Sequence, residues 1–374
     1  MTLNKMVKEK IILDGTKLAW HKDRVEAWLR GEKIAPITID CALTRACNYK
    51  CVYCYGQLQE NERKSMTQEA IFGFLDDAAE IGVKAVSFVS DGESTCSPHL
   101  TNSILRGKQN GLDMALGTNG ALLKKEGIEK TLGSLTYLRF NVSAADKIRY
   151  CEIHGCREND YENVIENIVN AVKIKKDNKL NTTIGIQMVL LPEFADQIMP
   201  LARLGKDLGV DYFVIKHCSD DENGTLGVNY SKYQKLIGFL EEAEKQSTET
   251  YQVGAKWSKI LSGGKREYSR CYGPAFIMQF SGSGLVAPCG MLFNEKYKKY
   301  HIGNIAEKSF KEIWESDRYK EVLDTLASER FDAKTMCGTL CLQHKTNEYL
   351  TALKEGRIKL KEPIGQKPMH SNFI

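Results

Sequence analysis

The first half of the chain alternates short apolar runs with segments in which apolar residues recur every three or four positions. The apolar runs predict buried strands at 37–44, 83–93, 112–120, 135–144, 182–191 and 211–217. The intervening segments predict helices at 66–82, 99–111, 124–134, 162–178 and 194–210. Six strands that alternate with helices indicate parallel strands joined by right-handed crossovers. We therefore expect an α/β fold, built as a partial (β/α)6 barrel of the TIM type.

This rhythm bounds the domains that we expect. Residues 1–36 form an N-terminal extension with a short helix at 21–31, and residues 37–218 form the barrel core. A connecting helical segment follows at 219–270. Residues 271–345 form a C-terminal domain, with a β-hairpin at 276–292 around Ser-Gly-Ser-Gly and a helix at 309–329. The tail occupies 346–374, and its part after residue 355 either covers the barrel mouth or is disordered.

Charge and composition narrow the class of protein. The 374 residues carry 52 basic and 48 acidic side chains, a balance too even to favour nucleic acid or an anionic membrane as partner. No apolar run approaches a membrane span, and the first residues lack the pattern of a signal peptide. We expect a soluble cytoplasmic protein. Its 12 cysteines then serve as metal ligands, catalytic thiols or core residues, because disulfides are rare in a reducing compartment.

Three of these cysteines, Cys47, Cys51 and Cys54, lie in one short loop after the first predicted strand. Thiolates favour zinc and iron–sulfur clusters. A structural zinc site needs four ligands, and no fourth cysteine or histidine lies nearby in this loop. Three thiolates on a [4Fe–4S] cluster leave one iron open, and that iron can bind a small molecule.

The C-x3-C-x2-C spacing, with Tyr53 before the last cysteine, resembles the motif of the radical SAM family. The resemblance implies that S-adenosylmethionine (SAM) binds the open iron and is cleaved reductively to a 5′-deoxyadenosyl radical. It also implies a flavodoxin- or ferredoxin-type electron donor.

The same resemblance implies contacts to SAM at the ends of successive strands. Residues similar to the family's SAM contacts are Tyr53, Asp91, Gly92, Glu93, Thr118, Asn119, Ser143 and Gln187. Asp91 departs from the family pattern, which has glycine there. Turn formation is an alternative role for Asp91 and for the Thr-Asn-Gly stretch that begins at Thr118.

Four further cysteines, Cys271, Cys289, Cys337 and Cys341, flank the predicted hairpin and follow the last long helix. Their surroundings resemble the SPASM/Twitch extension of radical SAM enzymes, which implies one auxiliary [4Fe–4S] cluster in a Twitch-type domain. The cysteine pattern is similar to that of dehydrogenases acting on the cyclitol 2-deoxy-scyllo-inosamine, except that the last pair is spaced C-x3-C. A structural zinc site held by the four cysteines is the alternative.

These features favour hydrogen abstraction from a small polar substrate such as a sugar, cyclitol or nucleotide sugar. Dehydrogenation needs a base, and the candidates are Lys216, His217, Arg149 and His154; strand alternation lets at most one of Lys216 and His217 face the interior. Epimerisation needs a thiol donor, and the candidates are Cys218, preferred, with Cys96, Cys151 and Cys156. Modification of a ribosomal peptide and a non-enzymatic iron–sulfur or zinc protein remain alternatives.

Overall fold

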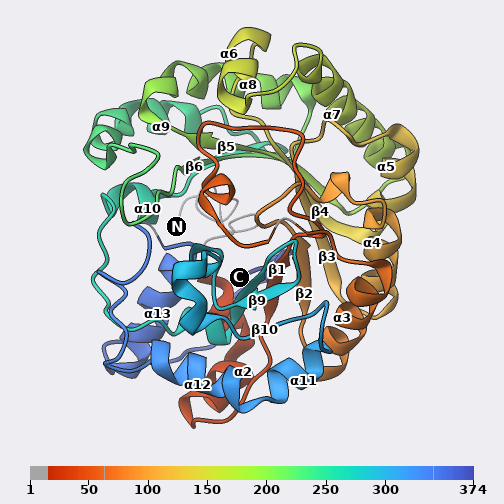
Figure 1. Cartoon of the computed structure of the whole chain (residues 1–374). Coiled ribbons are helices and arrows are strands. Elements are labelled where there is room, and N and C mark those ends of the chain that lie inside the picture. Colours follow the sequence, from red (N-terminus) through yellow and green to blue (C-terminus); the bar gives the residue numbers. More distant parts are fainter. Residues whose placement is uncertain (1–15, 63, 340) are drawn as a thin grey trace.

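The computed structural model describes residues 16–62, 64–339 and 341–374. A curved sheet in the order β10-β9-β8-β1-β2-β3-β4-β5-β6-β7 lies at its centre, with helices around the outside (Figure 1). The strands are β1 Thr38–Cys41, β2 Ala85–Phe88, β3 Asp113–Thr118, β4 Leu135–Asn141, β5 Thr183–Leu190, β6 Tyr212–His217, β7 Gln252–Ala255, β8 Ile277–Phe280, β9 Leu285–Ala287 and β10 Gly303–Asn304. Since β7 and β10 end the sheet, the barrel is partial, as predicted.

Helices follow most of the strands. They are α2 Lys22–Leu29, α3 Gln68–Ile81, α4 Leu100–Gln109, α5 Lys125–Thr131, α6 Lys147–His154, α7 Asp160–Asp177, α8 Ile198–Leu208, α9 Ile237–Glu244, α10 Trp257–Leu261, α11 Phe310–Glu315, α12 Asp317–Leu326 and α13 His344–Lys354. Local signals set their ends: the Thr67 hydroxyl accepts from the Ala70 amide at the start of α3, and Gly82 ends this helix in the left-handed conformation.

Strands β1 to β6 fall within the six predicted ranges, and all pair in parallel. Alternate residues face opposite sides of the sheet. On β4, Leu138 and Phe140 join the apolar core beneath the helices, whereas Tyr137 and Arg139 face the barrel interior. The outer face is therefore apolar, and the inner face is largely polar.

The second half of the chain corrects two expectations. The segment 219–270 is not only helical, because it contributes β7, which pairs in parallel with β6. The predicted hairpin is formed by β8 and β9, but β8 also pairs in parallel with β1. The C-terminal region therefore continues the sheet of the barrel core.

Two helix predictions also need correction. The helix expected at 309–329 is split into α11 and α12 at Ser316, whose hydroxyl accepts from the Tyr319 amide and so begins a new helix. The helix α6 was not expected; Asp146 caps its start by accepting from the Arg149 amide.

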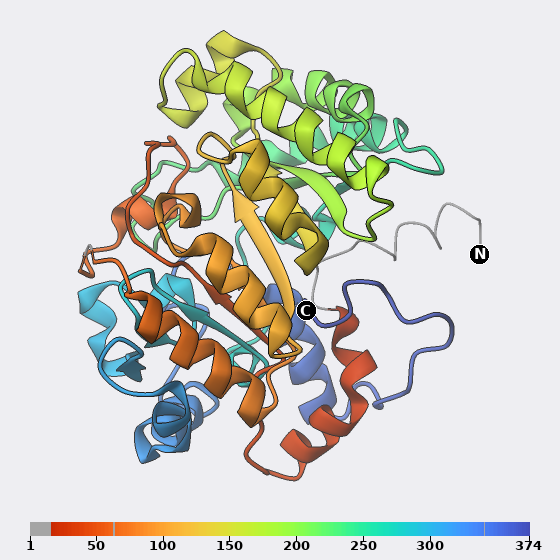
Figure 2. The same ribbon diagram turned by 90° about the vertical axis from the view of Figure 1, so that its right-hand side faces the viewer.

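The C-terminal tail closes the amino end of the barrel. Lys17 Nζ donates to the His370 carbonyl (2.9 Å), and Thr38 Oγ1 donates to the Asn372 carbonyl (2.6 Å). Phe373 is buried with Ala85, Ala115 and Tyr137 inside the barrel. In Figure 2 this dark blue tail lies on the right, and the loops from the carboxyl ends of the strands lie on the left. The tail was expected to cover the barrel mouth or to be disordered; it instead packs at the opposite, amino end of the barrel.

Candidate functional site

The cysteine loop, residues 47–54, leaves the carboxyl end of β1 and crosses the barrel mouth (red in Figure 1). Cys47 is exposed, and Cys51 and Cys54 are partly buried. Burial, together with the charges on Cys54 and Cys47, raises the pKa of the Cys51 thiol well above its usual value. The three thiols that the sequence singled out therefore lie close together.

The end of α6 supports this loop from below. The Lys50 amide donates to the His154 carbonyl (3.2 Å), and the Val52 amide donates to the Ile153 carbonyl (2.9 Å). At Gly155 the backbone has φ +54°, and a Cβ there would lie 2.5 Å from the Lys50 carbonyl oxygen. Glycine at this position lets the helix end approach the loop closely.

His154 is completely buried under the cysteine loop, and burial lowers its pKa to about 3, so the ring is neutral. The Ser143 amide donates to Nε2 (3.0 Å), which places the ring hydrogen on Nδ1. Nδ1 lies 3.5 Å from Cys51 Sγ and 3.4 Å from the Tyr53 hydroxyl. This geometry does not support His154 as a base for a substrate; the ring instead directs an N–H toward a candidate cluster ligand.

Glu93 connects the loops that follow β2 and β3. Its Oε1 accepts from the hydroxyls of Thr95 and Thr118 (2.7 Å each), and its Oε2 accepts from the Asn119 amide (2.7 Å). The Asn119 side chain in turn donates to Asn48 Oδ1 in the cysteine loop (2.9 Å). Three residues expected to contact SAM, Glu93, Thr118 and Asn119, thus form one network beside the cysteines.

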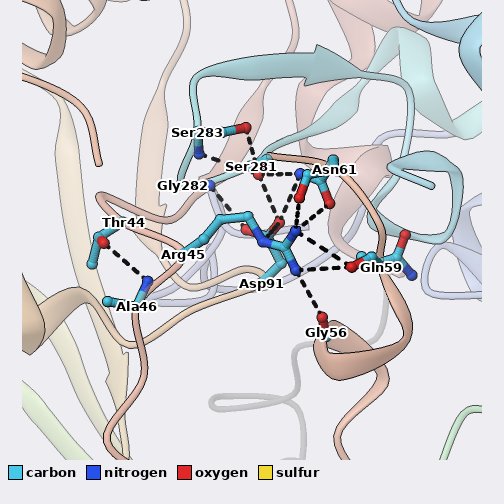
Figure 3. Close-up of polar contacts among 10 residues, drawn as sticks. All are labelled: Thr44, Arg45, Ala46, Gly56, Gln59, Asn61, Asp91, Ser281, Gly282 and Ser283. Carbon is cyan, nitrogen blue, oxygen red and sulfur yellow. Dashed lines mark hydrogen bonds and ion pairs between the residues drawn. The ribbon is translucent and has the colours of Figure 1, made fainter. Parts of the chain in front are cut away.

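Asp91 and Arg45 form a buried ion pair (3.1 Å) with side chains 4% and 2% exposed (Figure 3). Asp91 also accepts from the Ser281 hydroxyl (2.6 Å) and the Gly282 amide (2.9 Å) in the turn between β8 and β9. The carboxylate is thereby engaged by protein partners, and its contact with SAM stays a prediction. It joins the mouth of the barrel to the C-terminal hairpin.

The other expected SAM contacts lie near the same mouth. Gly92 packs against the backbone of the loop after β1, where a Cβ would lie 1.9 Å from the Thr44 carbonyl oxygen. Ser143 Oγ accepts from the Val189 amide (3.2 Å), and Gln187 Nε2 donates to Asn141 Oδ1 on the inner face of β4 (3.1 Å). Their contact with a cofactor remains a prediction.

The auxiliary cysteines, Cys271, Cys289, Cys337 and Cys341, come from separate segments and lie close enough for their charges to interact. Asn347 on α13 connects two of them: its Nδ2 lies 3.6 Å from Cys271 Sγ and 3.5 Å from Cys341 Sγ. Backbone amides of Tyr272 and Gly273 donate to Asn347 Oδ1, which orients the NH2 group toward the sulfurs. The guanidinium of Arg266 lies beside the same set and donates to the Gly338 carbonyl.

The two donor sets consist of three and four free cysteine thiols, which is the ligand chemistry of iron–sulfur clusters. Across residues 16–62, 64–339 and 341–374, no three His, Cys, Asp or Glu side chains converge on one ion position. A zinc site of four cysteines would hold all four sulfurs about 2.3 Å from one ion. A four-iron cluster is held by cysteine thiolates, which both sets supply.

The inner face of the barrel carries Asp40, Arg139 and Lys216, whose charges interact. Burial, reinforced by Lys259 and Arg139, lowers the pKa of Lys216 to about 7. His217 points to the opposite face of β6, where its ring lies 6.0 Å from the ring of Tyr233. Of the two strand-six bases, the structure therefore places only Lys216 in the interior.

The candidate thiols and the remaining base lie in different surroundings. Cys218 is buried, and its Sγ donates to the Tyr53 carbonyl in the cysteine loop (3.6 Å). Cys96 lies near Asn48 (3.9 Å), while Cys151 and Cys156 lie beside each other on the outside, with 3.9 Å between the sulfurs. Arg149 is paired with Asp196 and Glu152, so it is committed to surface ion pairs and is not placed as a base.

Comparison with known proteins agrees with this geometry. Residues 42–205 match the model of the Radical SAM superfamily, and residues 271–341 match SPASM, an iron-sulfur cluster-binding domain. This chain is a radical SAM protein with a SPASM domain. Its cofactors are [4Fe–4S] clusters and SAM.

Two curated relatives show the range of chemistry in this superfamily. The chain is 25% identical over 305 residues to the AdoMet-dependent heme synthase of Methanosarcina barkeri, covering 75% of this chain and 83% of the relative. It is also 25% identical over 301 residues to the tungsten-containing aldehyde ferredoxin oxidoreductase cofactor-modifying protein of Pyrococcus furiosus, covering 74% and 80%.

Solved structures support the fold. Streptococcus suis SuiB bound to S-adenosylmethionine has a TM-score of 0.62 at 18% identity, covering 79% of this chain and 70% of that chain. Native anSMEcpe with bound AdoMet has a TM-score of 0.56 at 15% identity, covering 86% and 100%. In the described part of this radical SAM protein, no helix has the length and apolarity needed to cross a membrane.

Sequence reasoning missed several residues of the site. It gave no role to Arg45, Arg139 or Asn347, and it considered His154 only as a base. Arg139 had a detectable signal, because a charged residue inside an otherwise apolar strand must face a different environment from its neighbours. Arg45 and Asn347 act through partners far away in the sequence.

Proposed function

We propose that this radical SAM protein dehydrogenates a small polar substrate bound inside the barrel, with the auxiliary cluster as electron acceptor. The observation that carries the proposal is Lys216, which faces the barrel interior with a pKa lowered to about 7. A group with this pKa is suited to remove a proton at neutral pH.

The cysteine loop and the auxiliary cysteines would hold the two clusters. When bound, the first cluster with SAM supplies the 5′-deoxyadenosyl radical, and the auxiliary cluster supplies an acceptor for one electron. Cys47, Cys51 and Cys54 would provide three thiolates and leave one iron open for SAM. The SAM contacts would come from the ends of the adjacent strands, at Glu93, Thr118, Asn119, Ser143 and Gln187. A flavodoxin or ferredoxin would deliver the electron needed for cleavage.

The chain's own residues then complete the oxidation of a secondary alcohol. Lys216 Nζ would accept the hydroxyl proton of the substrate. The cluster and SAM held by the cysteine loop would supply the group that removes the hydrogen atom from the carbon, and the auxiliary cysteines would hold the acceptor for the remaining electron. The products are a carbonyl compound, 5′-deoxyadenosine and methionine. Lys216 must be neutral at the start of each cycle, which its lowered pKa allows.

Epimerisation is the alternative, with Cys218 as the preferred thiol. A thiol donor must reach the face of the substrate opposite the radical. Cys218 contacts the Tyr53 carbonyl of the cysteine loop, which places it on the side where SAM would bind. This position of Cys218 favours dehydrogenation over epimerisation. Modification of a ribosomal peptide is a further alternative.

Turnover of candidate substrates in deuterated water separates these reactions. Dehydrogenation gives a product two hydrogens lighter, with one 5′-deoxyadenosine per product. Epimerisation gives a product of unchanged formula that contains solvent deuterium. Absence of 5′-deoxyadenosine after reduction with SAM present would exclude the proposal altogether.

A further inference from the structure

Arg139 is a buried charged residue whose charge helps to lower the pKa of Lys216, but to which the proposed chemistry assigns no binding partner. It lies near the middle of β4, on the inner face, and is only 8% exposed. Its register partners on the two neighbouring strands are both glycine, Gly117 on β3 and Gly185 on β5. A Cβ at Gly117 would lie 3.2 Å from an Arg139 terminal nitrogen, so the guanidinium leans over this glycine.

The Arg139 guanidinium has no hydrogen-bond acceptor in the described part of the chain. Among the residues that the structure describes, no side chain or carbonyl accepts a hydrogen bond from it, and its Nε is fully enclosed. The guanidinium carbon of Arg139 lies 5.7 Å from the centre of the Tyr137 ring. A guanidinium keeps its charge inside proteins, and a buried, unpaired cation is strongly unfavourable. This arrangement is best explained if a ligand supplies the missing anion.

A second unsatisfied donor lies beside Arg139. The Tyr212 hydroxyl on β6 is buried without a hydrogen-bond partner in the described part of the chain, and the charge on Arg139 acts on it. The Tyr212 ring covers Gly185: a Cβ added at Gly185 would lie 2.1 Å from a carbon of the Tyr212 ring. Replacement of that glycine would therefore displace Tyr212 from its place next to Arg139.

The surrounding charge favours an anion. The carboxylate that interacts with Arg139 is Asp40, but Asp40 accepts a hydrogen bond from Gln279 (3.2 Å), and burial raises its pKa to about 6. Lys216 and Lys256 act on Asp40 from the other side of the barrel. Because Arg139, Lys216 and Lys256 all interact with the single carboxylate of Asp40, the charge around it is predominantly positive.

We propose that Arg139, assisted by the Tyr212 hydroxyl, binds a carboxylate of the substrate. A planar guanidinium pairs with two carboxylate oxygens at once. Phosphate sites commonly add the amides of a helix N-terminus or a glycine-rich loop, but Arg139 and Tyr212 both lie within strands. This inference rests on the proposed function, because it assumes that the substrate occupies the barrel interior.

The arrangement also limits the size of the substrate. Tyr212 and Lys216 lie on the same face of β6, four residues apart, which is about 13 Å along the strand. Both Arg139 and Lys216 are long enough to extend into this interval. The carboxylate would lie toward the end closed by the tail, and the reacting carbon would lie toward the cysteine loop. A compact sugar acid or cyclitol acid fits this spacing.

The test compares matched probes on the reconstituted holoenzyme with SAM bound. Titration calorimetry with glucuronate, glucose and glucose 6-phosphate measures the preference for a carboxylate. We expect glucuronate to bind wild type at least about tenfold tighter than glucose, and Arg139→Met to abolish this preference. Tyr212→Phe should reduce it by a smaller factor. Arg106→Met removes an arginine paired with Asp76 on the outer helices and should change nothing.

Two further readouts separate the possible failures. SAM affinity and reductive SAM cleavage without substrate should stay within about twofold of wild type in Arg139→Met, and its thermal stability should not fall. Equal binding of glucuronate and glucose, including no binding of either, would overturn the inference, as would tighter binding of glucose 6-phosphate. Loss of SAM binding in Arg139→Met would assign Arg139 to the cofactor instead. Failure of wild type to cleave SAM would refute the proposed function itself.

Discussion

The two cysteine sets of this protein differ in how the chain brings them together. The cysteine loop contributes three thiols from eight consecutive residues, at the barrel mouth, with Cys47 exposed. The auxiliary cysteines come from segments up to 70 residues apart, and Cys289 and Cys341 are buried. The first set is local and incomplete, which suits a cluster that must bind a cofactor. The second is dispersed and complete, which suits a cluster that only exchanges electrons.

Their surroundings differ in the same way. His154 directs one ring N–H toward Cys51, whereas Asn347 directs an amide toward both Cys271 and Cys341. Hydrogen bonds to cluster sulfurs tune reduction potentials. We therefore expect the potential of each cluster to depend on a hydrogen-bond donor of its own. The buried Arg45–Asp91 ion pair links the mouth of the barrel to the C-terminal hairpin.

We expect the largest effect when one cysteine of the cysteine loop is replaced. Cys51→Ala should abolish SAM cleavage, because the first cluster loses one of three thiolates. Iron content should fall from about eight to about four per chain, since the auxiliary cluster remains. Quantification of 5′-deoxyadenosine and iron checks both outcomes, and persistent SAM cleavage would contradict the assignment.

Removal of one auxiliary cysteine should separate SAM cleavage from formation of the oxidised product. Cys337→Ala should lower iron content similarly but preserve SAM cleavage, while oxidised product is lost because the electron has no acceptor. Product and 5′-deoxyadenosine are measured in the same assay. If product still forms at the wild-type ratio to 5′-deoxyadenosine, the auxiliary set is structural.

Lys216 lies on the inner face of β6 and belongs to neither cysteine set, so its loss should slow product formation without affecting either cluster. Lys216→Met should reduce the rate by roughly 100-fold or more, the usual contribution of a general base. In wild type, burial and the charges of Lys259 and Arg139 lower the pKa of Lys216 to about 7, against the opposing charges of Cys218 and Asp40. Because the neutral amine is the active form, the rate should rise with pH up to about 7 and then level off. A rate that falls over this interval would indicate that the ammonium form is required.

The Arg45–Asp91 ion pair, which links the barrel mouth to the C-terminal hairpin, should contribute to the free energy of unfolding. Asp91→Ala leaves Arg45 buried without its carboxylate and should lower the free energy of unfolding by about 3 kcal/mol. Chemical denaturation of the holoenzyme measures this change. Glu32→Ala removes an exposed ion pair with Arg30 and should leave stability unchanged. Equal stability of both variants would show that the buried pair is dispensable.

The smallest expected effect separates the control of the two clusters. His154→Phe should lower the potential of the first cluster by on the order of tens of millivolts, because one N–H to sulfur is lost. Asn347→Leu should do the same for the auxiliary cluster only. Potentiometric titration followed by electron paramagnetic resonance reads both. A shift of the wrong cluster would contradict the proposed contacts.

Much of the barrel could be predicted because its signals are local. Short apolar strands, the Thr67 cap and Gly82 follow from residues within a few positions of one another. The strand β7 escaped prediction because Gln252–Ala255 is short and not strongly apolar, and only its pairing with β6 makes it a strand. The contact between β8 and β1 joins residues more than 200 positions apart, which no periodicity reveals.

The sequence by itself determined the six β/α units, the cysteine loop and its likeness to radical SAM proteins, because spacing within a few residues decides these features. Only the tertiary structure decided that His154 lies under Cys51 and that Asp91 pairs with Arg45 and with the turn of the hairpin. It also decided that Arg139 lacks a hydrogen-bond partner among the described residues. These properties depend on which distant groups share a buried space. A buried polar or charged group costs free energy unless it is paired, so the presence or absence of each partner matters.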